Sequence, residues 1–157
     1  MNHYELPNDL APKELAHYML DKIVEHFSVN PHQRRCGNST SVAGVIDQCY
    51  YSPQSLADPH PDNIGCGIGM FLPPDVGLTI DRKRPNGLGV DTLIKDRSEI
   101  LDDKKLPDPL LTIDAGILAS MQDLHDWDSY WCREGLTVQG KAKVEDIRES
   151  INSTYKV

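Results

Sequence analysis

The chain has 157 residues, a length that suits one globular domain over 1–157, and its hydrophobic content of 39% predicts a modest core. Its formal net charge of −8 argues against direct nucleic-acid binding, since proteins that bind phosphates need a basic face. No apolar run reaches the roughly 18 residues of a membrane span and the N-terminal residues lack a signal-peptide pattern, so we expect a cytoplasmic protein without membrane contact.

Residues 12–27 have the pattern of an amphipathic helix. Pro12 suits its first turn, and apolar side chains recur every four residues on one face, at Leu15, Met19, Ile23 and Phe27. The sequence therefore predicts a first helix with a clear inward face.

The segment 28–48 is polar and rich in turn-forming residues, which predicts a connection that is a candidate for mobility. Its basic pair, Arg34 and Arg35, suits a phosphate or carboxylate ligand because guanidinium groups bind such anions through two hydrogen bonds. The alternative is a pair of solvated loop arginines, and the sequence leaves both open.

The segment from Cys49 to Leu72 predicts a β-hairpin. Two extended stretches, Cys49–Tyr51 and Cys66–Leu72, flank a loop rich in proline and aspartate. Glycines alternate with larger residues after the loop, which favours a close approach of the backbone to another element. Tyr50 lies in the first stretch and is a candidate to stack on a nucleotide base.

Four cysteines without an export signal favour reduced thiols over disulfides: Cys36, Cys49, Cys66 and Cys132. They form no C-x-x-C pair, the spacing of common structural zinc sites. A zinc site that combines Cys49, His60 and Cys66 is the alternative. We expect buried thiols beside the hairpin, with no bound metal and no cofactor.

The C-terminal half predicts further helices. Residues 79–88 read as a polar turn, a second candidate for mobility, and apolar residues between Val90 and Leu101 suggest a helix. A longer helix is expected over 109–126, and a last one over about 137–153 with Thr137 as its N-cap.

Residues 108–134 are acidic and contain the densest aromatic cluster of the chain. The acidic side chains include Asp123, Asp126 and Asp128, and they form either a surface for a basic partner or an ordinary solvated face. The aromatic side chains are Trp127, Tyr130 and Trp131, which either anchor an interface or base, or fix the last helix to the core.

His125-Asp126 resembles the dipeptide of metal-dependent HD phosphohydrolases. That chemistry needs more histidines and a distant aspartate around the metal, and the chain has no H-x-x-x-H spacing. The alternative is local: His125 ends a helix, where a cation complements the helix dipole, and Asp126 turns the chain.

Three short motifs resemble small phage-encoded accessory proteins, which carry an N-terminal helix, a "C-x-Y … C-A-V-G" hairpin and a helix that ends in "L-Q-x-x-H-D". The matching residues here are Cys49-x-Tyr51, Cys66–Gly69 followed by Leu72-Pro73, and Met121–Asp126. Gly67 stands where alanine is usual and Met121 where leucine is usual. The resemblance implies a phage or mobile-element origin, and small proteins of that origin often inhibit host enzymes or sequester signalling molecules.

We therefore expect an α+β fold in which three to four helices pack around a small antiparallel hairpin, and a non-catalytic protein. The leading hypothesis is an accessory protein that inhibits a host defence protein through its acidic and aromatic surface. The alternative is an oligomeric sponge for a nucleotide signal, in which Arg34, Arg35 and an aromatic side chain hold the ligand. A metal-dependent phosphohydrolase that uses His125 and Asp126 is the third hypothesis.

Overall fold

The computed structural model describes residues 3–29, 51–52, 66–84 and 88–156. Within these ranges there are six α-helices, three short 3₁₀ helices and one two-stranded antiparallel sheet. This content agrees with the predicted α+β class, but the helices outnumber the expected three to four. None of the described helices has both the length and the apolar character needed to cross a membrane.

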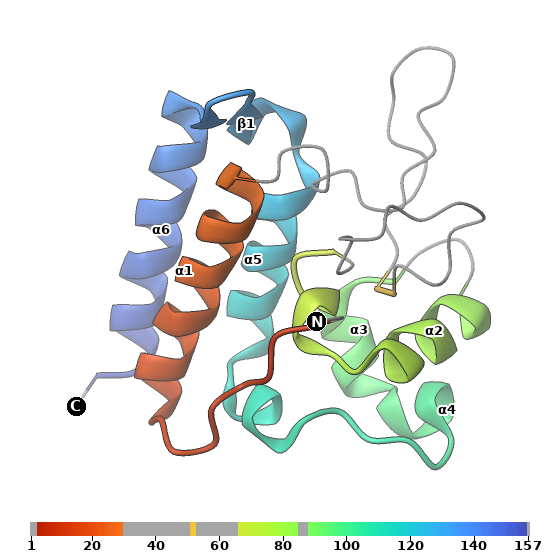
Figure 1. Cartoon of the computed structure of the whole chain (residues 1–157). Helices are drawn as coiled ribbons and strands as arrows, with labels where there is room; N and C mark the ends of the chain where they lie inside the picture. Colours follow the sequence, from red (N-terminus) through yellow and green to blue (C-terminus); the bar gives the residue numbers. More distant parts are fainter. Residues whose placement is uncertain (1–2, 30–50, 53–65, 85–87, 157) are drawn as a thin grey trace, which may run out of the picture.

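The three longest helices, α1 (Pro12–Val29), α5 (Ala115–Asp126) and α6 (Val138–Thr154), pack against one another (Figure 1). The predicted first helix is confirmed and its apolar face is buried throughout. It continues to Val29, and the remainder of the predicted polar segment, 30–48, lies outside the described residues.

The last helix is confirmed together with its cap. The side chain of Thr137 accepts a hydrogen bond of 3.0 Å from the backbone N–H of Gly140. The predicted helix over 109–126 begins later, because Asp114 caps α5 by accepting a hydrogen bond of 3.1 Å from the N–H of Ile117. The preceding residues form the 3₁₀ helix η4 (Asp108–Thr112).

A second group of shorter helices lies beside α5: α2 (Pro74–Lys83), α3 (Val90–Lys95) and α4 (Arg97–Leu101). The single helix expected between Val90 and Leu101 is thus two helices. The predicted polar segment at 79–88 is wrong for residues 79–83, which belong to α2 because Ile80 faces the core. Residues 85–87 lie outside the described ranges.

The predicted second strand, Cys66–Leu72, is wrong. These residues form a turn and the 3₁₀ helix η3 (Gly69–Phe71), with local hydrogen bonds such as that from the N–H of Met70 to the carbonyl of Cys66, 2.9 Å. All seven residues are buried, so the segment is surrounded by protein and has no alternating exposed face. Cys49 and Tyr50, in the predicted first strand, lie outside the described residues.

The glycines of this turn permit a close approach to other parts of the chain, as expected. A Cβ on Gly69 would lie 2.1 Å from the backbone oxygen of Tyr51, and one on Gly67 would lie 2.8 Å from Cβ of His125 in α5. Tyr51 is in turn held by the buried carboxylate of Asp81, which accepts a hydrogen bond of 3.0 Å from its N–H.

The hairpin of the described structure lies elsewhere, between β1 (Trp131–Cys132) and β2 (Gly135–Leu136). Trp131 pairs with Leu136, and Cys132 pairs with Gly135, whose φ of 122° is a conformation that favours glycine. β2 contacts both α1 and α6. The hairpin therefore closes one end of the three-helix group.

Candidate binding surface

The two tryptophans of the aromatic cluster have opposite environments. Trp131 is 7% exposed, its indole Nε1 donates a hydrogen bond of 2.6 Å to the carbonyl of Leu124, and its ring centroid lies 6.3 Å from that of Phe27. Trp127 is 59% exposed. The core-packing interpretation therefore holds for Trp131, and Trp127 remains the candidate for binding.

The backbone on both sides of Trp127 is hydrogen-bonded. Its N–H donates a hydrogen bond of 3.2 Å to the carbonyl of Asp123, and this bond closes the last turn of α5. Its carbonyl accepts a hydrogen bond of 3.2 Å from the N–H of Tyr130. The rings of Trp127 and Tyr130 lie 6.4 Å apart with an interplanar angle of 31°. The exposed indole is thus presented from an ordered turn, η5 (Asp128–Tyr130), and not from a long loop.

This turn is fixed to α6 by a close backbone approach. The carbonyl of Tyr130 accepts a hydrogen bond of 3.0 Å from the N–H of Thr137, and a Cβ on Gly140 would lie 2.1 Å from the same oxygen. Only glycine leaves room for this approach. A preorganised surface binds a partner without first losing conformational entropy, so the arrangement favours recognition.

Carboxylates interact with one another near the C-terminal end of α5, the helix that Trp127 follows. Partial loss of hydration raises the pKa of Asp123 above its ordinary 3.8, and the nearby carboxylates of Asp126 and Asp91 raise it further. The Lys143 ammonium lowers it and lies 6.0 Å from the centroid of the Tyr130 ring. Like charges are thus held close together at the end of α5.

His125 lies in the core. Its ring is buried, its Nδ1 donates a hydrogen bond of 2.8 Å to Asp126 Oδ1, and its ring centroid lies 4.8 Å from that of Phe27. The described residues contain no group of three or more histidine, cysteine or acidic side chains placed to hold a metal ion. The geometry of His125 is that of a packed side chain linked to the acidic end of α5.

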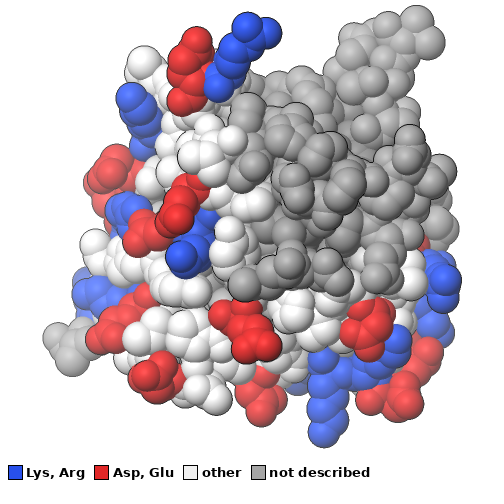
Figure 2. All heavy atoms as spheres, in the orientation of Figure 1, with Lys and Arg blue, Asp and Glu red and all other residues white. Residues whose placement is uncertain are grey.

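The predicted acidic region is not one continuous patch. Asp108 and Asp114 precede α5, whereas Asp123 and Asp126 lie in its last turn, and 12 residues of helix span about 18 Å. On the face shown in Figure 2, acidic and basic side chains are interspersed. Of the carboxylates that the structure describes here, Asp123 and Asp126 lie at the end of α5 that Trp127 follows.

Several predicted site residues are not described by the structure. Arg34, Arg35 and Tyr50, proposed for a nucleotide, lie outside the described residues, as do Cys49 and His60 of the zinc alternative. The side chain of Asp128 also lies outside the described part of the chain. Cys66 is described and buried, and its Sγ accepts a hydrogen bond of 3.2 Å from the N–H of Gly69.

Two further apolar side chains are exposed at the same end of the three-helix group. Val29 is the last residue of α1 and is 73% exposed, and Val138 is the first residue of α6 and is 85% exposed. We call Val29, Trp127, Tyr130 and Val138 the hairpin end, since β1 and β2 lie there (Figure 1). Neither valine was predicted from the sequence. The pattern that could have indicated them is an apolar residue that lies off the core face of its helix.

Comparison with protein-family models, with curated proteins and with solved structures gives no match.

Proposed function

We propose that this chain is a non-catalytic binding protein that attaches to a basic surface of a partner protein through its hairpin end. The observation that carries the proposal is the exposed indole of Trp127, which an ordered turn presents next to the ring of Tyr130. Tryptophan and tyrosine dominate the energetics of protein interfaces because they bury a large apolar area with few rotatable bonds.

The carboxylates indicate that the partner's surface carries positive charge. Burial raises the pKa of Asp123 most, and repulsion from the carboxylates of Asp126 and Asp91 raises it further. A lysine or arginine from a partner would relieve that repulsion and direct association toward this end of the molecule. A basic protein surface with an apolar pocket for Trp127 meets both requirements.

The resemblance to phage-encoded accessory proteins extends this proposal to the partner's identity. On that reading the partner is a host protein, such as a defence component, which the chain inhibits by covering its basic surface. The nucleotide-sponge alternative depends on Arg34, Arg35 and Tyr50, and no described geometry favours it over the hairpin end.

The test is a capture experiment from host-cell lysate with the full chain and a matched control. Trp127→Ala and Asp123→Lys should each lose a protein that the wild type captures. Leu111→Ala removes another exposed apolar side chain, 38% exposed, that lies before α5, and should keep the captured protein. Equal capture by Trp127→Ala and Leu111→Ala would refute the proposal.

A further inference from the structure

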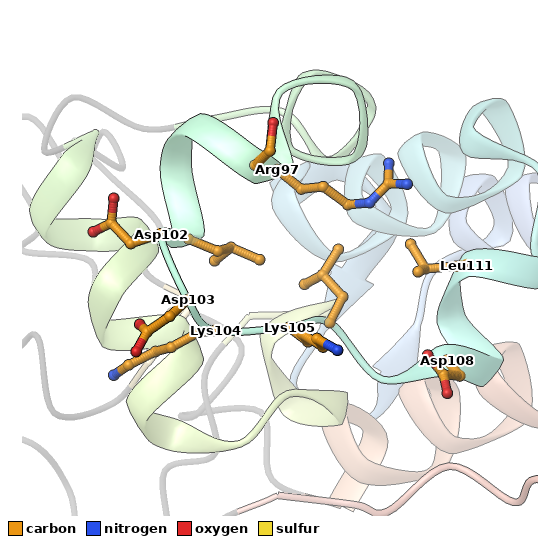
Figure 3. Close-up of a pocket in the computed structure, with 10 residues that line it drawn as sticks. Arg97, Asp102, Asp103, Lys104, Lys105, Asp108 and Leu111 are labelled. Atoms are coloured by element: carbon orange, nitrogen blue, oxygen red, sulfur yellow. The ribbon is translucent and has the colours of Figure 1, made fainter.

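A cavity of about 380 Å³ lies between α4, the turn that follows it and η4 (Figure 3). This region is separate from the hairpin end, since η4 precedes α5 and Trp127 follows it. The volume falls in the lower part of the range found for small-molecule sites. The cavity therefore has room for a small organic molecule.

The cavity has an apolar floor. Leu101 and Leu106 line it and are buried, while Leu111 lines its edge and is partly exposed. Such a floor favours the apolar body of a ligand because contact removes hydrocarbon surface from water on both sides.

Two cations at the cavity form no ion pair with any residue that the structure describes. Among the residues that the structure describes, neither Arg97 nor Lys105 forms an ion pair. Nη1 of Arg97 donates a hydrogen bond of 2.6 Å to the carbonyl of Ile94, which leaves its other N–H groups for a ligand.

The other charges of the lining are mostly engaged elsewhere. Asp102 pairs with Lys83 at 3.2 Å and Lys104 pairs with Asp75 at 3.6 Å. In Figure 3 the side chains of Asp102, Asp103 and Lys104 extend away from Leu111, whereas Arg97 extends toward it. Asp108 is the one labelled carboxylate on the Leu111 side, so two cations face one anion there.

The turn beside the cavity is strained. Asp102 has φ 58° and ψ −110°, the conformation of the first central residue of a type II′ turn, where glycine is preferred. A hydrogen bond of 2.9 Å from the N–H of Lys104 to the carbonyl of Leu101 closes this turn. Strain of this kind is retained where surrounding structure imposes it, and it concentrates at ligand sites.

We propose that this cavity binds a small organic anion, a carboxylate or a phosphate ester. The apolar body of this ligand lies on Leu101, Leu106 and Leu111, and its anionic oxygens bind Arg97 and Lys105. The planar guanidinium of Arg97 suits two-point recognition of either anion, and the Lys105 ammonium adds a mobile point charge. The site is independent of the partner-binding surface proposed above.

The test is isothermal titration of the full chain with three ligands that share one aromatic body: 2-naphthoate, 2-naphthyl phosphate and neutral 2-naphthamide. At least one anion should bind saturably and about tenfold or more tightly than the amide, since charge-assisted hydrogen bonds contribute that much. The tighter of the two anions identifies the preferred head group. Arg97→Gln and Lys105→Gln should each weaken anion binding about tenfold and leave amide binding unchanged.

Both cations are exposed, so these substitutions should preserve the fold, and circular dichroism checks this. Trp127→Ala is the matched control and should bind the anions like the wild type, which excludes stacking on the exposed indole. Amide binding as tight as anion binding, or unchanged anion affinity in both cation variants, would overturn the proposal. Equal affinity for inorganic phosphate and naphthyl phosphate would also overturn it, because the leucines would then contribute nothing.

Discussion

At the scale of single residues, Trp127 and Trp131 are four positions apart in the sequence but have different environments in the structure. The Trp131 indole donates to a backbone carbonyl and packs near Phe27, whereas Trp127 follows the last turn of α5 and faces solvent. Periodicity could not assign these roles, because α5 ends at Asp126, before the aromatic residues that a continuous helix would have placed on one face. The end of the helix decides which aromatic residue reaches the core.

The different exposure of the two indoles is directly measurable. Trp127→Phe leaves Trp131 as the only tryptophan, and its emission should be blue-shifted and weakly quenched by acrylamide. Trp131→Phe leaves Trp127, whose emission should be quenched several-fold more strongly because solvent reaches the ring. This second variant also loses the hydrogen bond to Leu124, so its stability should fall by about 1–3 kcal/mol. Equal quenching in the two variants would show that the assignment of the indoles is wrong.

Asp123 gives a pH prediction at the same scale. Its pKa in the folded chain is raised above 3.8, so the folded state holds this proton more tightly than the unfolded state does. The contribution of Asp123 to stability should therefore rise as the pH falls from neutral through its folded pKa. The effect on stability should be small, since the side chain is exposed and solvent screens it.

The causes of this shift can be separated by NMR titration of the Asp123 carboxyl. Lys143→Gln removes the one cation that lowers its pKa, so the titration midpoint should move upward. Asp91→Asn removes a repelling carboxylate and should move it downward. A wild-type midpoint below 3.8, or a downward shift in Lys143→Gln, would contradict the proposed electrostatics of the hairpin end.

At the scale of elements, the segment Cys66–Leu72 shows why a short apolar run is ambiguous. Its composition suits a strand, but burial on every side removes the alternation that would identify one, and glycine permits the tight 3₁₀ turn seen here. Which neighbour the glycines approach depends on Tyr51 and on α5, which are distant in the chain. That information is tertiary and is not carried by the local pattern.

Gly69→Ala distinguishes the turn from the predicted strand. A Cβ would lie 2.1 Å from the Tyr51 carbonyl oxygen, so the backbone must shift, and we expect a loss of about 2–3 kcal/mol in the free energy of unfolding. In a strand the same change would be neutral or stabilising. Gly116→Ala, in the exposed first turn of α5, is the control and should change stability by less than about 1 kcal/mol. Urea denaturation measures both, and a neutral Gly69→Ala would contradict the observed packing.

Longer elements were predictable because many residues repeat the same signal. The first helix carries four apolar side chains at a spacing of four, and the last carries both a period and a capping threonine. Shorter elements have no such repeated pattern. Asp114 caps the start of α5 within the helix expected over 109–126, and Asp96 separates α3 from α4 within the helix expected between Val90 and Leu101. Trp127 entered the candidate surface through its place in a dense aromatic cluster, whereas each valine is a single apolar residue that no such pattern marks.

At the scale of the whole molecule, α5 connects the two proposed sites. It packs with α1 and α6 on one side and with α3 on the other, begins after η4 and ends at Trp127 (Figure 1). The cavity and the hairpin end therefore lie at opposite ends of a helix about 18 Å long. Substitutions at one site should leave the other intact, which is why each site supplies the control for the other.

The proposed role of Trp127, on its ordered turn, is to anchor a partner protein. The most direct measurement is the affinity of the captured and purified partner for the wild type, Trp127→Ala and Leu111→Ala, determined by isothermal titration. An interface anchor contributes 2 kcal/mol or more, so we predict a loss of about thirtyfold or more for Trp127→Ala. Leu111→Ala should stay within about threefold of the wild type. Wild-type affinity in Trp127→Ala would contradict the claim and place the binding surface elsewhere on the molecule.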